Sequence, residues 1–153
     1  MDSIDTMILS TLLHDGREAW ARIGERVGLT GPAVAERVRR LEERGVIRGY
    51  SALVAPEPAG FPLAAFVSVT LETPHHRRAF LARVAALPEI QECHHVTGDD
   101  DYLLKVRCRG AADLDRLLTD QLKGGPGVVR TRTVVVLRSE KESVRLPPLE
   151  ARE

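Results

Sequence analysis

The sequence has few cysteines and no long apolar segment, and each absence excludes a class of protein. Its two cysteines, Cys93 and Cys108, stand in no CxxC or Cys/His spacing, so we expect two reduced, packed thiols, with a strand-to-strand disulfide as the alternative. No apolar run approaches the roughly 18 residues of a membrane span, and the acidic start MDSIDTMILS is unlike a secretion signal. We therefore expect a cytoplasmic protein with no membrane partner.

The protein also has no formal net charge and few aromatic residues. The 22 basic side chains equal the 22 acidic ones, and aromatic residues make up 4% of the 153-residue chain. A neutral molecule is not drawn to nucleic acid as a whole, so any such binding must depend on local charge. Hydrophobic residues account for 43% of the sequence, which is enough for a core in one domain or in two small ones.

The segment from Ile23 to Arg48 is typical of a helix-turn-helix. Gly28 can end the first helix in the left-handed conformation, and Thr30 can cap the second. Pro32 fits the first turn, where no backbone N–H is needed. Apolar residues then recur at i, i+4 and i+7 and face the core: Val34, Val38 and Leu41. Arginines occupy the other sides of this second helix, which makes its outer face basic.

The second helix of the motif carries the residues that we expect to contact double-stranded DNA. An arginine fork can hold a phosphate or the O6/N7 edge of guanine in the major groove. The candidate contacts are Thr30, Gly31, Pro32, Ala33, Glu36, Arg37, Arg39, Arg40 and Arg44. The alternative is a solvated amphipathic helix, because Glu36, Glu42 and Glu43 can pair with these arginines at i, i+3 and i+4. The segment alone does not decide between the two.

Residues 1–50 are predicted to form a winged helix-turn-helix domain. The expected helices are Ser3 to about Leu13, Glu18 to Val27 and Ala33 to Glu43. Ser3 would cap the first helix, Trp20 and Ile23 would face inward from the second, and Gly45 would end the third. Residues 46–54 have a strand-like composition and predict a short wing or a connecting strand.

The second half of the chain is predicted to be ferredoxin-like. Residues 51–63 form the expected linker, because the run APEPAGFP breaks helices and strands. The order βαββαβ then fills residues 64–142, with strands at Ala64 to Glu72, Ile90 to Thr97, Asp101 to Arg109 and Val128 to Arg138, and helices at Pro74 to Leu87 and Ala111 to Lys123. The protein is thus expected to be α+β, with a charged tail over residues 143–153.

Both faces of the expected sheet carry apolar residues. In the last strand, Val134 and Val136 lie on one face, and Val135 and Leu137 lie on the other. The two helices of a ferredoxin-like domain cover a single face, so the second apolar face predicts self-association. We expect a homodimer at least.

Four blocks, in this order and spacing, resemble the Lrp/AsnC (leucine-responsive/asparagine-responsive, feast/famine) family of transcription regulators. They are IDTMILSTLLHDGR, VGLTGPAVAERVRRLEERGVIRGYSALV, IQECHHVTGDDDYLLKV and PGVVRTRTVVVL. The resemblance implies an N-terminal DNA-binding domain and a C-terminal ligand-binding domain. It also implies dimers that assemble into octamers or other rings, with an amino acid as the usual small-molecule effector.

The resemblance further implies an effector site between dimers, at the turn Gly98, Asp99, Asp100, Asp101 and Tyr102. A carboxylate beside a glycine-opened backbone can receive an ammonium group, and free amides can hold a carboxylate. The alternative is a β-turn whose Asp99 and Asp100 point into water. His95 departs from the apolar residue that is more usual at its place, which affects the effector's expected identity.

Metal binding and catalysis are not expected. His94 and His95 are adjacent on a strand, so they point to opposite faces and cannot hold one ion together. No Ser/His/Asp or Cys/His arrangement is present, and we expect no cofactor. An enzyme alternative is sirohaem decarboxylase, whose subunits resemble the same two-domain family and in which one of these histidines would serve the tetrapyrrole. An amino-acid sensor without DNA binding is disfavoured by the intact helix from Thr30 to Arg44.

Overall fold

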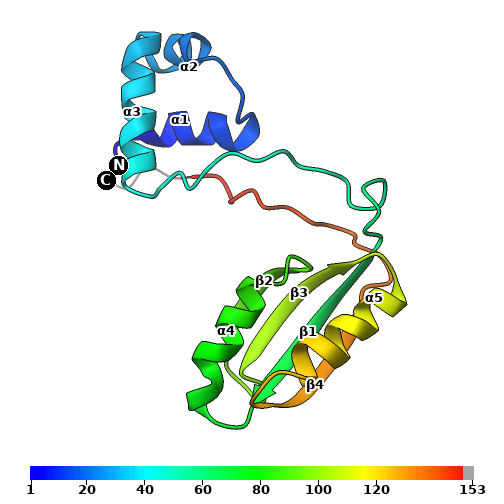
Figure 1. The fold of residues 1–153 in the computed structure, drawn as a ribbon. Coiled ribbons are helices and arrows are strands. Elements are labelled where there is room, and N and C mark those ends of the chain that lie inside the picture. Colours follow the sequence, from blue (N-terminus) through cyan, green and yellow to red (C-terminus); the bar gives the residue numbers. More distant parts are fainter. Residues whose placement is uncertain (150–153) are drawn as a thin grey trace. The chain divides into compact units, whose positions relative to one another are not determined.

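A computed structural model of the protein describes residues 1–149. The chain forms two compact units (Figure 1). The N-terminal unit contains Met1–Leu53 together with the described residues from Lys141 onward, and the C-terminal unit is Val54–Glu140. Residues 54–63 of the segment expected to be a linker therefore belong to the C-terminal unit.

The N-terminal unit is built from three helices. They are α1 (Ser3–His14), α2 (Trp20–Val27) and α3 (Gly31–Glu43). Ile8, Ile23, Val34 and Val38 are buried together and form the core of this unit. The apolar spacing predicted for α3 is thus the spacing that packs it against α1 and α2.

The start of each of the first two helices differs from the prediction. Asp2, rather than Ser3, caps α1: its Oδ1 accepts a hydrogen bond from Asp5 N at 2.8 Å, and Asp5 Oδ2 accepts one from Asp2 N at 3.1 Å. This reciprocal pair satisfies two N–H groups, which a serine at the next position cannot do. Helix α2 begins at Trp20, two residues later than expected, and Trp20 is partly exposed instead of facing inward.

The predicted wing does not form. Gly45 ends α3 with a φ of 68°, as expected, and Val46 N then bonds back to Leu41 O at 2.9 Å. In the described structure, residues 46–54 pair with no other strand. Instead, Tyr50 Oη donates a hydrogen bond to Glu42 Oε1 at 2.9 Å, which holds this segment against the end of α3. A strand-like composition cannot make a strand without a partner edge.

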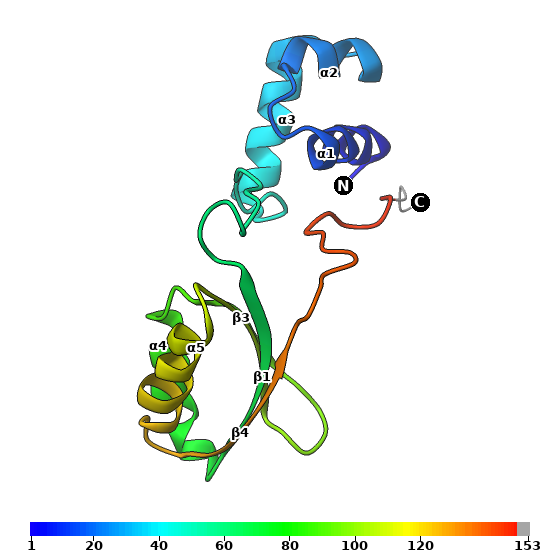
Figure 2. The same cartoon turned by 90° about the vertical axis from the view of Figure 1, so that its right-hand side faces the viewer.

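The C-terminal unit contains one antiparallel sheet in the order β2-β3-β1-β4. The strands are β1 (Leu63–Leu71), β2 (Ile90–His95), β3 (Tyr102–Cys108) and β4 (Val128–Val135). Figure 2 shows helices α4 (Arg77–Ala85) and α5 (Ala111–Arg116) on the same side of this sheet. The arrangement is the predicted ferredoxin-like βαββαβ fold.

Each of the two expected helices is divided into two pieces. A single turn of 3₁₀-helix, η1 (Pro74–His76), precedes α4, and a π-helical stretch, η2 (Leu117–Lys123), follows α5. The π geometry is visible in the hydrogen bond from Gly124 N to Thr119 O, 3.0 Å long, which spans five residues. Phe80 and Val84 of α4 are buried, whereas Leu81 is partly exposed.

The two faces of the sheet differ in burial. The helix-covered face is fully apolar: Ala65, Val67, Val69, Tyr102, Leu104, Val106 and Cys108 are buried there with Phe80, Leu114, Leu117 and Leu122. On the opposite face, Phe66 and Val134 pair across β1 and β4 and remain 40% and 59% exposed. The predicted second apolar face therefore exists, and within the C-terminal unit no helix covers it (Figure 2). Cys93 and Cys108 are free thiols.

Candidate DNA-binding helix and ligand turn

The turn between α2 and α3 depends on two glycines. Gly28 has a φ of 72°, as predicted, and its N–H bonds to Gly24 O. Gly24 was not singled out from the sequence, yet a Cβ at this position would collide with the Leu29 carbonyl. Thr30 caps α3, accepting from Ala33 N at 3.4 Å. The close crossing of the two helices thus requires a residue without a side chain at Gly24.

Two of the predicted DNA-contacting arginines lie on the exposed side of α3 and are paired with glutamates. Arg39 Nη2 lies 2.7 Å from Glu36 Oε1, and its Nη1 pairs with Glu43. Arg40 Nε lies 3.0 Å from Glu36 Oε1. Hydrogen bonds from Arg39 and then Arg40 lower the pKa of Glu36 to about 2. These i, i+3 and i+4 pairs are the alternative that the sequence left open, but exposed pairs are weak and a phosphate can replace the carboxylate.

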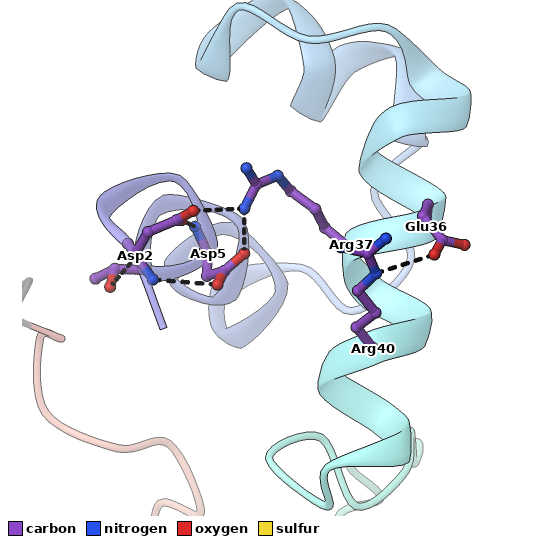
Figure 3. Close-up of polar contacts among 6 residues, drawn as sticks. Asp2, Asp5, Glu36, Arg37 and Arg40 are labelled. Carbon is purple, nitrogen blue, oxygen red and sulfur yellow. Dashed lines mark hydrogen bonds and ion pairs between the residues drawn. The ribbon is translucent and has the colours of Figure 1, made fainter.

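Arg37 does not share that exposed side. Its side chain reaches across to α1, where Nη1 lies 2.7 Å from Asp2 Oδ2 and 2.7 Å from Asp5 Oδ1 (Figure 3). Hydrogen bonds from Arg37 to Asp2 and then to Asp5 raise the arginine's pKa. Asp2 and Asp5 therefore both cap α1 and bind Arg37 of α3. Contrary to the prediction from the sequence, Arg37 does not project outward with Arg39 and Arg40.

Asp100, in the predicted effector turn, is already bound within the domain. It accepts a hydrogen bond from Thr70 Oγ1 at 3.0 Å, and its two oxygens lie 3.1 Å from Arg130 Nη2 and 3.2 Å from Arg132 Nη2. The Thr70 hydrogen bond and the two arginines lower the pKa of Asp100. This carboxylate therefore ties the turn to the edge strand β4.

Asp101 and Tyr102 also serve the fold. Asp101 Oδ2 accepts from Leu71 N at 2.7 Å, where the β1–β4 register shifts. The Tyr102 ring is buried against Phe80, with centroids 4.9 Å apart, so it faces the core. Gly98, at a φ of 113°, and Asp99 are the exposed residues of the turn. Of the five predicted effector residues, these two offer free surface to a ligand.

The histidines of β2 lie on opposite faces, as their adjacency predicts. His94 is paired with Leu103 and its Nε2 lies 3.0 Å from Glu92 Oε2. His95 is paired with Tyr102, with ring centroids 5.2 Å apart, and its side chain remains exposed. Within residues 1–149, no group of three His, Cys, Asp or Glu side chains could hold a metal ion. No helix in this part of the chain is long and apolar enough to cross a membrane.

Two family models match the chain in consecutive segments. The AsnC-type helix-turn-helix domain matches residues 1–42, and the Lrp/AsnC ligand binding domain matches residues 64–146. The leucine-responsive regulatory proteins of Salmonella typhimurium and Escherichia coli (strain K12) are each 45% identical over 148 residues, covering 95% of this chain and 90% of theirs.

Solved structures of regulators are similar over nearly the whole chain. A transcriptional regulator of Neisseria meningitidis in complex with L-methionine has a TM-score of 0.89 at 32% identity, covering 96% of both chains. A feast or famine regulatory protein of M. tuberculosis, also complexed with L-methionine, has a TM-score of 0.88 at 37% identity, covering 97% of this chain and 99% of that one. The relatives are regulators rather than enzymes, and by sequence and by fold the chain belongs to the Lrp/AsnC family of transcription regulators.

Proposed function

We propose that this regulator binds specific operators in double-stranded DNA in the cytoplasm, as a homodimer or larger assembly whose DNA binding changes when an amino acid binds. The observation that carries the proposal is that both domains match in order, the helix-turn-helix at residues 1–42 and the ligand-binding domain at residues 64–146. One unit supplies the DNA contact, and the other supplies assembly and ligand binding.

The proposed DNA contacts lie on the start and the exposed side of α3. At the start of α3, the positive end of the helix dipole and the Gly31 N–H favour a phosphate, whereas Pro32 has no N–H and Ala33 N is bonded to Thr30 Oγ1. Arg39, Arg40 and Arg44 are exposed further along the helix. When DNA approaches, phosphates or guanine edges take the place of Glu36 and Glu43 on Arg39 and Arg40, and the released Glu36 can accept from a cytosine amino group.

Arg37 is proposed to act through the helix rather than on the DNA. Its bonds to Asp2 and Asp5 join α3 to the first turn of α1. This connection partly sets the orientation of α3 within the N-terminal unit, and docking of α3 in the major groove depends on that orientation. Arg37 is thus a positioning residue within the DNA-binding unit.

Dimerisation is proposed to use the open face of the sheet. Phe66 and Val134 lie side by side on that face, and a second copy would cover both and place two DNA-binding units on one operator. Val135, on the other side of the edge strand β4, is 46% exposed as well. This second exposed apolar residue supports assembly of the dimers into an octamer or other larger oligomer.

The amino-acid effector is proposed to bind at the Gly98 to Tyr102 turn. Asp99 would receive the ligand ammonium, and the backbone opened by Gly98 would hold its carboxylate. Asp100 and Asp101 fasten the turn to its neighbouring strands, so a ligand that draws Arg130 away from Asp100 would loosen the edge of the sheet. The two similar structures that contain L-methionine support an amino acid as the ligand class.

Selection from a random DNA pool, with and without each amino acid, tests the proposal as a whole. We expect a pool enriched in two half-sites related by two-fold symmetry, and at least one amino acid that changes the footprint and the sedimentation coefficient together. A coupling of about 1–3 kcal/mol would change operator affinity roughly 5- to 150-fold. A pool without enrichment would contradict operator binding, and a footprint indifferent to all amino acids would contradict the effector.

A further inference from the structure

A pocket of about 450 Å³ lies in the C-terminal unit, at the end of β3 away from the 98–102 turn. Its volume falls in the range of small-molecule sites in proteins, roughly 300–1,000 Å³. The proline-rich segment before β1 forms one wall, the connection from α4 to β2 forms a second, and the end of β3 with α5 forms the rest. The pocket is thus separate from the proposed effector turn.

The wall from the proline-rich segment is a folded loop. Phe61 N bonds to Pro56 O at 2.8 Å, and Gly60 N bonds to Glu57 O at 3.0 Å. The guanidinium of Arg109 lies 5.6 Å from the centre of the Phe61 ring, which attaches the loop to the end of β3. Pro56 and Phe61 therefore present a defined apolar surface to the pocket.

Arg116 and, less strongly, Arg109 lower the pKa of the Asp113 carboxyl in this pocket, but Arg109 lies near that carboxylate without forming a direct ion pair. Both carboxylates are held by Arg116, whose Nη2 lies 2.7 Å from Asp113 Oδ1 and 3.3 Å from Glu89 Oε1. Asp113 Oδ2 also accepts from Arg109 N at 3.3 Å. Among the residues that the structure describes, the Arg109 guanidinium has the Phe61 ring as its partner and no carboxylate within ion-pair distance.

We propose that this pocket binds a small monocarboxylate with a short aliphatic body and no ammonium group, such as a 2-oxo acid. The Arg109 fork would bind the carboxylate through charge-assisted hydrogen bonds. The aliphatic body would pack on Pro56 and Phe61. A free amino acid is a poorer fit because its ammonium group would meet carboxylates already bound by Arg116, and arginines outnumber acids around the pocket.

The position of the pocket gives the ligand a physical effect on the chain. Its apolar wall is the loop directly before β1, the segment that leads back to the DNA-binding unit. A ligand held between Arg109 and this loop would stabilise the loop against opening. The amides of Gly60 and Phe61 should then exchange their hydrogens more slowly.

The test uses the full-length protein and two probes with the same carbon skeleton, 4-methyl-2-oxopentanoate and leucine, with inorganic phosphate as a simple anion. Calorimetry and hydrogen exchange would be measured on the parent and on the variants Arg109→Ala, Arg109→Lys and Phe61→Ala. Arg78→Ala, at an exposed position on α4 outside the pocket, is the matched control. Gly98→Val alters the separate effector turn.

We expect the oxo acid to bind the parent and slow exchange at Gly60 and Phe61. Arg109→Ala should weaken binding roughly 10- to 100-fold, as loss of a charge-assisted hydrogen bond predicts. Arg109→Lys should retain part of the affinity and show that the variant fold is intact, while Arg78→Ala and Gly98→Val should leave oxo-acid affinity unchanged. Leucine binding should depend on Gly98 and not on Arg109, so loss of leucine binding alone would affect only the effector proposal. Equal oxo-acid affinity in the parent and Arg109→Ala, or phosphate binding as tight as the oxo acid, would overturn the assignment.

Discussion

Arg37 and Asp5 connect two helices across 32 positions of sequence, with Arg37 Nη1 2.7 Å from Asp5 Oδ1. The same nitrogen lies 2.7 Å from Asp2 Oδ2, and the two aspartates also form the capping box of α1. A change at any one of these three residues therefore acts on a helix cap and on a helix-to-helix contact together.

The Arg37→Ala variant should destabilise the N-terminal unit without changing the number of phosphate contacts. Asp5 is largely buried, and removal of its partner leaves a carboxylate short of hydrogen bonds, at a cost on the order of 1 kcal/mol. Operator affinity should fall, while the slope of log affinity against log salt should stay the same. Asp5→Asn should reproduce the effect in urea unfolding and in DNA binding. A stable Arg37→Ala variant whose salt slope drops by about one unit would instead make Arg37 a phosphate contact.

Arg39→Ala and Arg40→Ala should leave stability almost unchanged but weaken DNA binding. Both side chains are exposed and bonded to carboxylates of their own helix, so the free energy of unfolding should change little. A phosphate-contacting arginine should weaken all sequences and lower the salt slope by about one unit, whereas a base-reading one should cost about 1–3 kcal/mol at one position. Filter binding over a salt series measures the operator affinity and the salt slope. Arg78→Ala in the C-terminal unit is the control, and wild-type binding by both variants would remove this side of α3 from the interface.

The order of elements could be predicted from the sequence because each depends on local periodicity. The spacing of Val34, Val38 and Leu41 and the glycine at position 28 determine α3 and its turn within a few residues. In β3 the alternating residues Tyr102, Leu104, Val106 and Cys108 are buried, but Leu103 on the other face kept the sequence from showing a cleanly apolar side. Predictions from local sequence were wrong where an element needs a partner that is distant in the sequence. Residues 46–54 have the composition of a strand, but in the described part of the chain no strand lies beside them.

The partners of the site residues could not be predicted for the same reason. Nothing near Arg37 in the sequence shows that Asp2 and Asp5 will stand across from it. Asp100 likewise looks like a solvated turn residue until β4 places Arg130 and Arg132 next to it. Gly24 has an ordinary helical place in the sequence, and its close approach to Leu29 follows only from the crossing of α2 and α3.

Gly24→Ala should therefore destabilise the N-terminal unit. The added methyl group would collide with the Leu29 carbonyl, which is backbone and cannot swing away. Overpacking of this kind costs about 1–3 kcal/mol, more than the helix propensity gained by alanine, roughly 1 kcal/mol. Thermal unfolding followed by circular dichroism measures the loss. Glu25→Ala, at the adjacent exposed position of α2, should be near neutral, and a Gly24→Ala variant as stable as the parent would show that the turn can relax.

Protonation of Asp100 should make the C-terminal unit less stable in acid. Its pKa is lowered by the hydrogen bond from Thr70 and by Arg130 and Arg132. A carboxyl group whose folded pKa lies below its unfolded value of 3.8 stabilises the fold above that pH, and the contribution is lost as pH falls toward the folded pKa. Urea unfolding of the parent and of Asp100→Asn should thus differ most at neutral pH and converge below pH 3.8. A difference that does not depend on pH would mean that the charge of Asp100 contributes nothing.

Charge placed on the open face of the sheet should dissociate the assembly. Phe66 and Val134 are opposite one another on β1 and β4, and they are 40% and 59% exposed in the single chain. Phe66→Glu or Val134→Glu should therefore leave the fold of one chain intact, but in a dimer each would bury an unpaired carboxylate. Sedimentation should show monomers, and operator affinity should fall by about 10²- to 10⁴-fold because the second half-site is no longer linked to the first.

The control for this change is Ala82→Glu, at an exposed position of α4 on the helix-covered side of the domain. It adds the same charge, so it separates a specific effect at the sheet from a general effect of charge on solubility or on DNA repulsion. If the sheet variants dissociate and the control does not, the two apolar side chains hold the dimer, because nothing else differs between the proteins. If all of them sediment like the parent, the chains associate through another surface, and the exposed Phe66 and Val134 need a different partner.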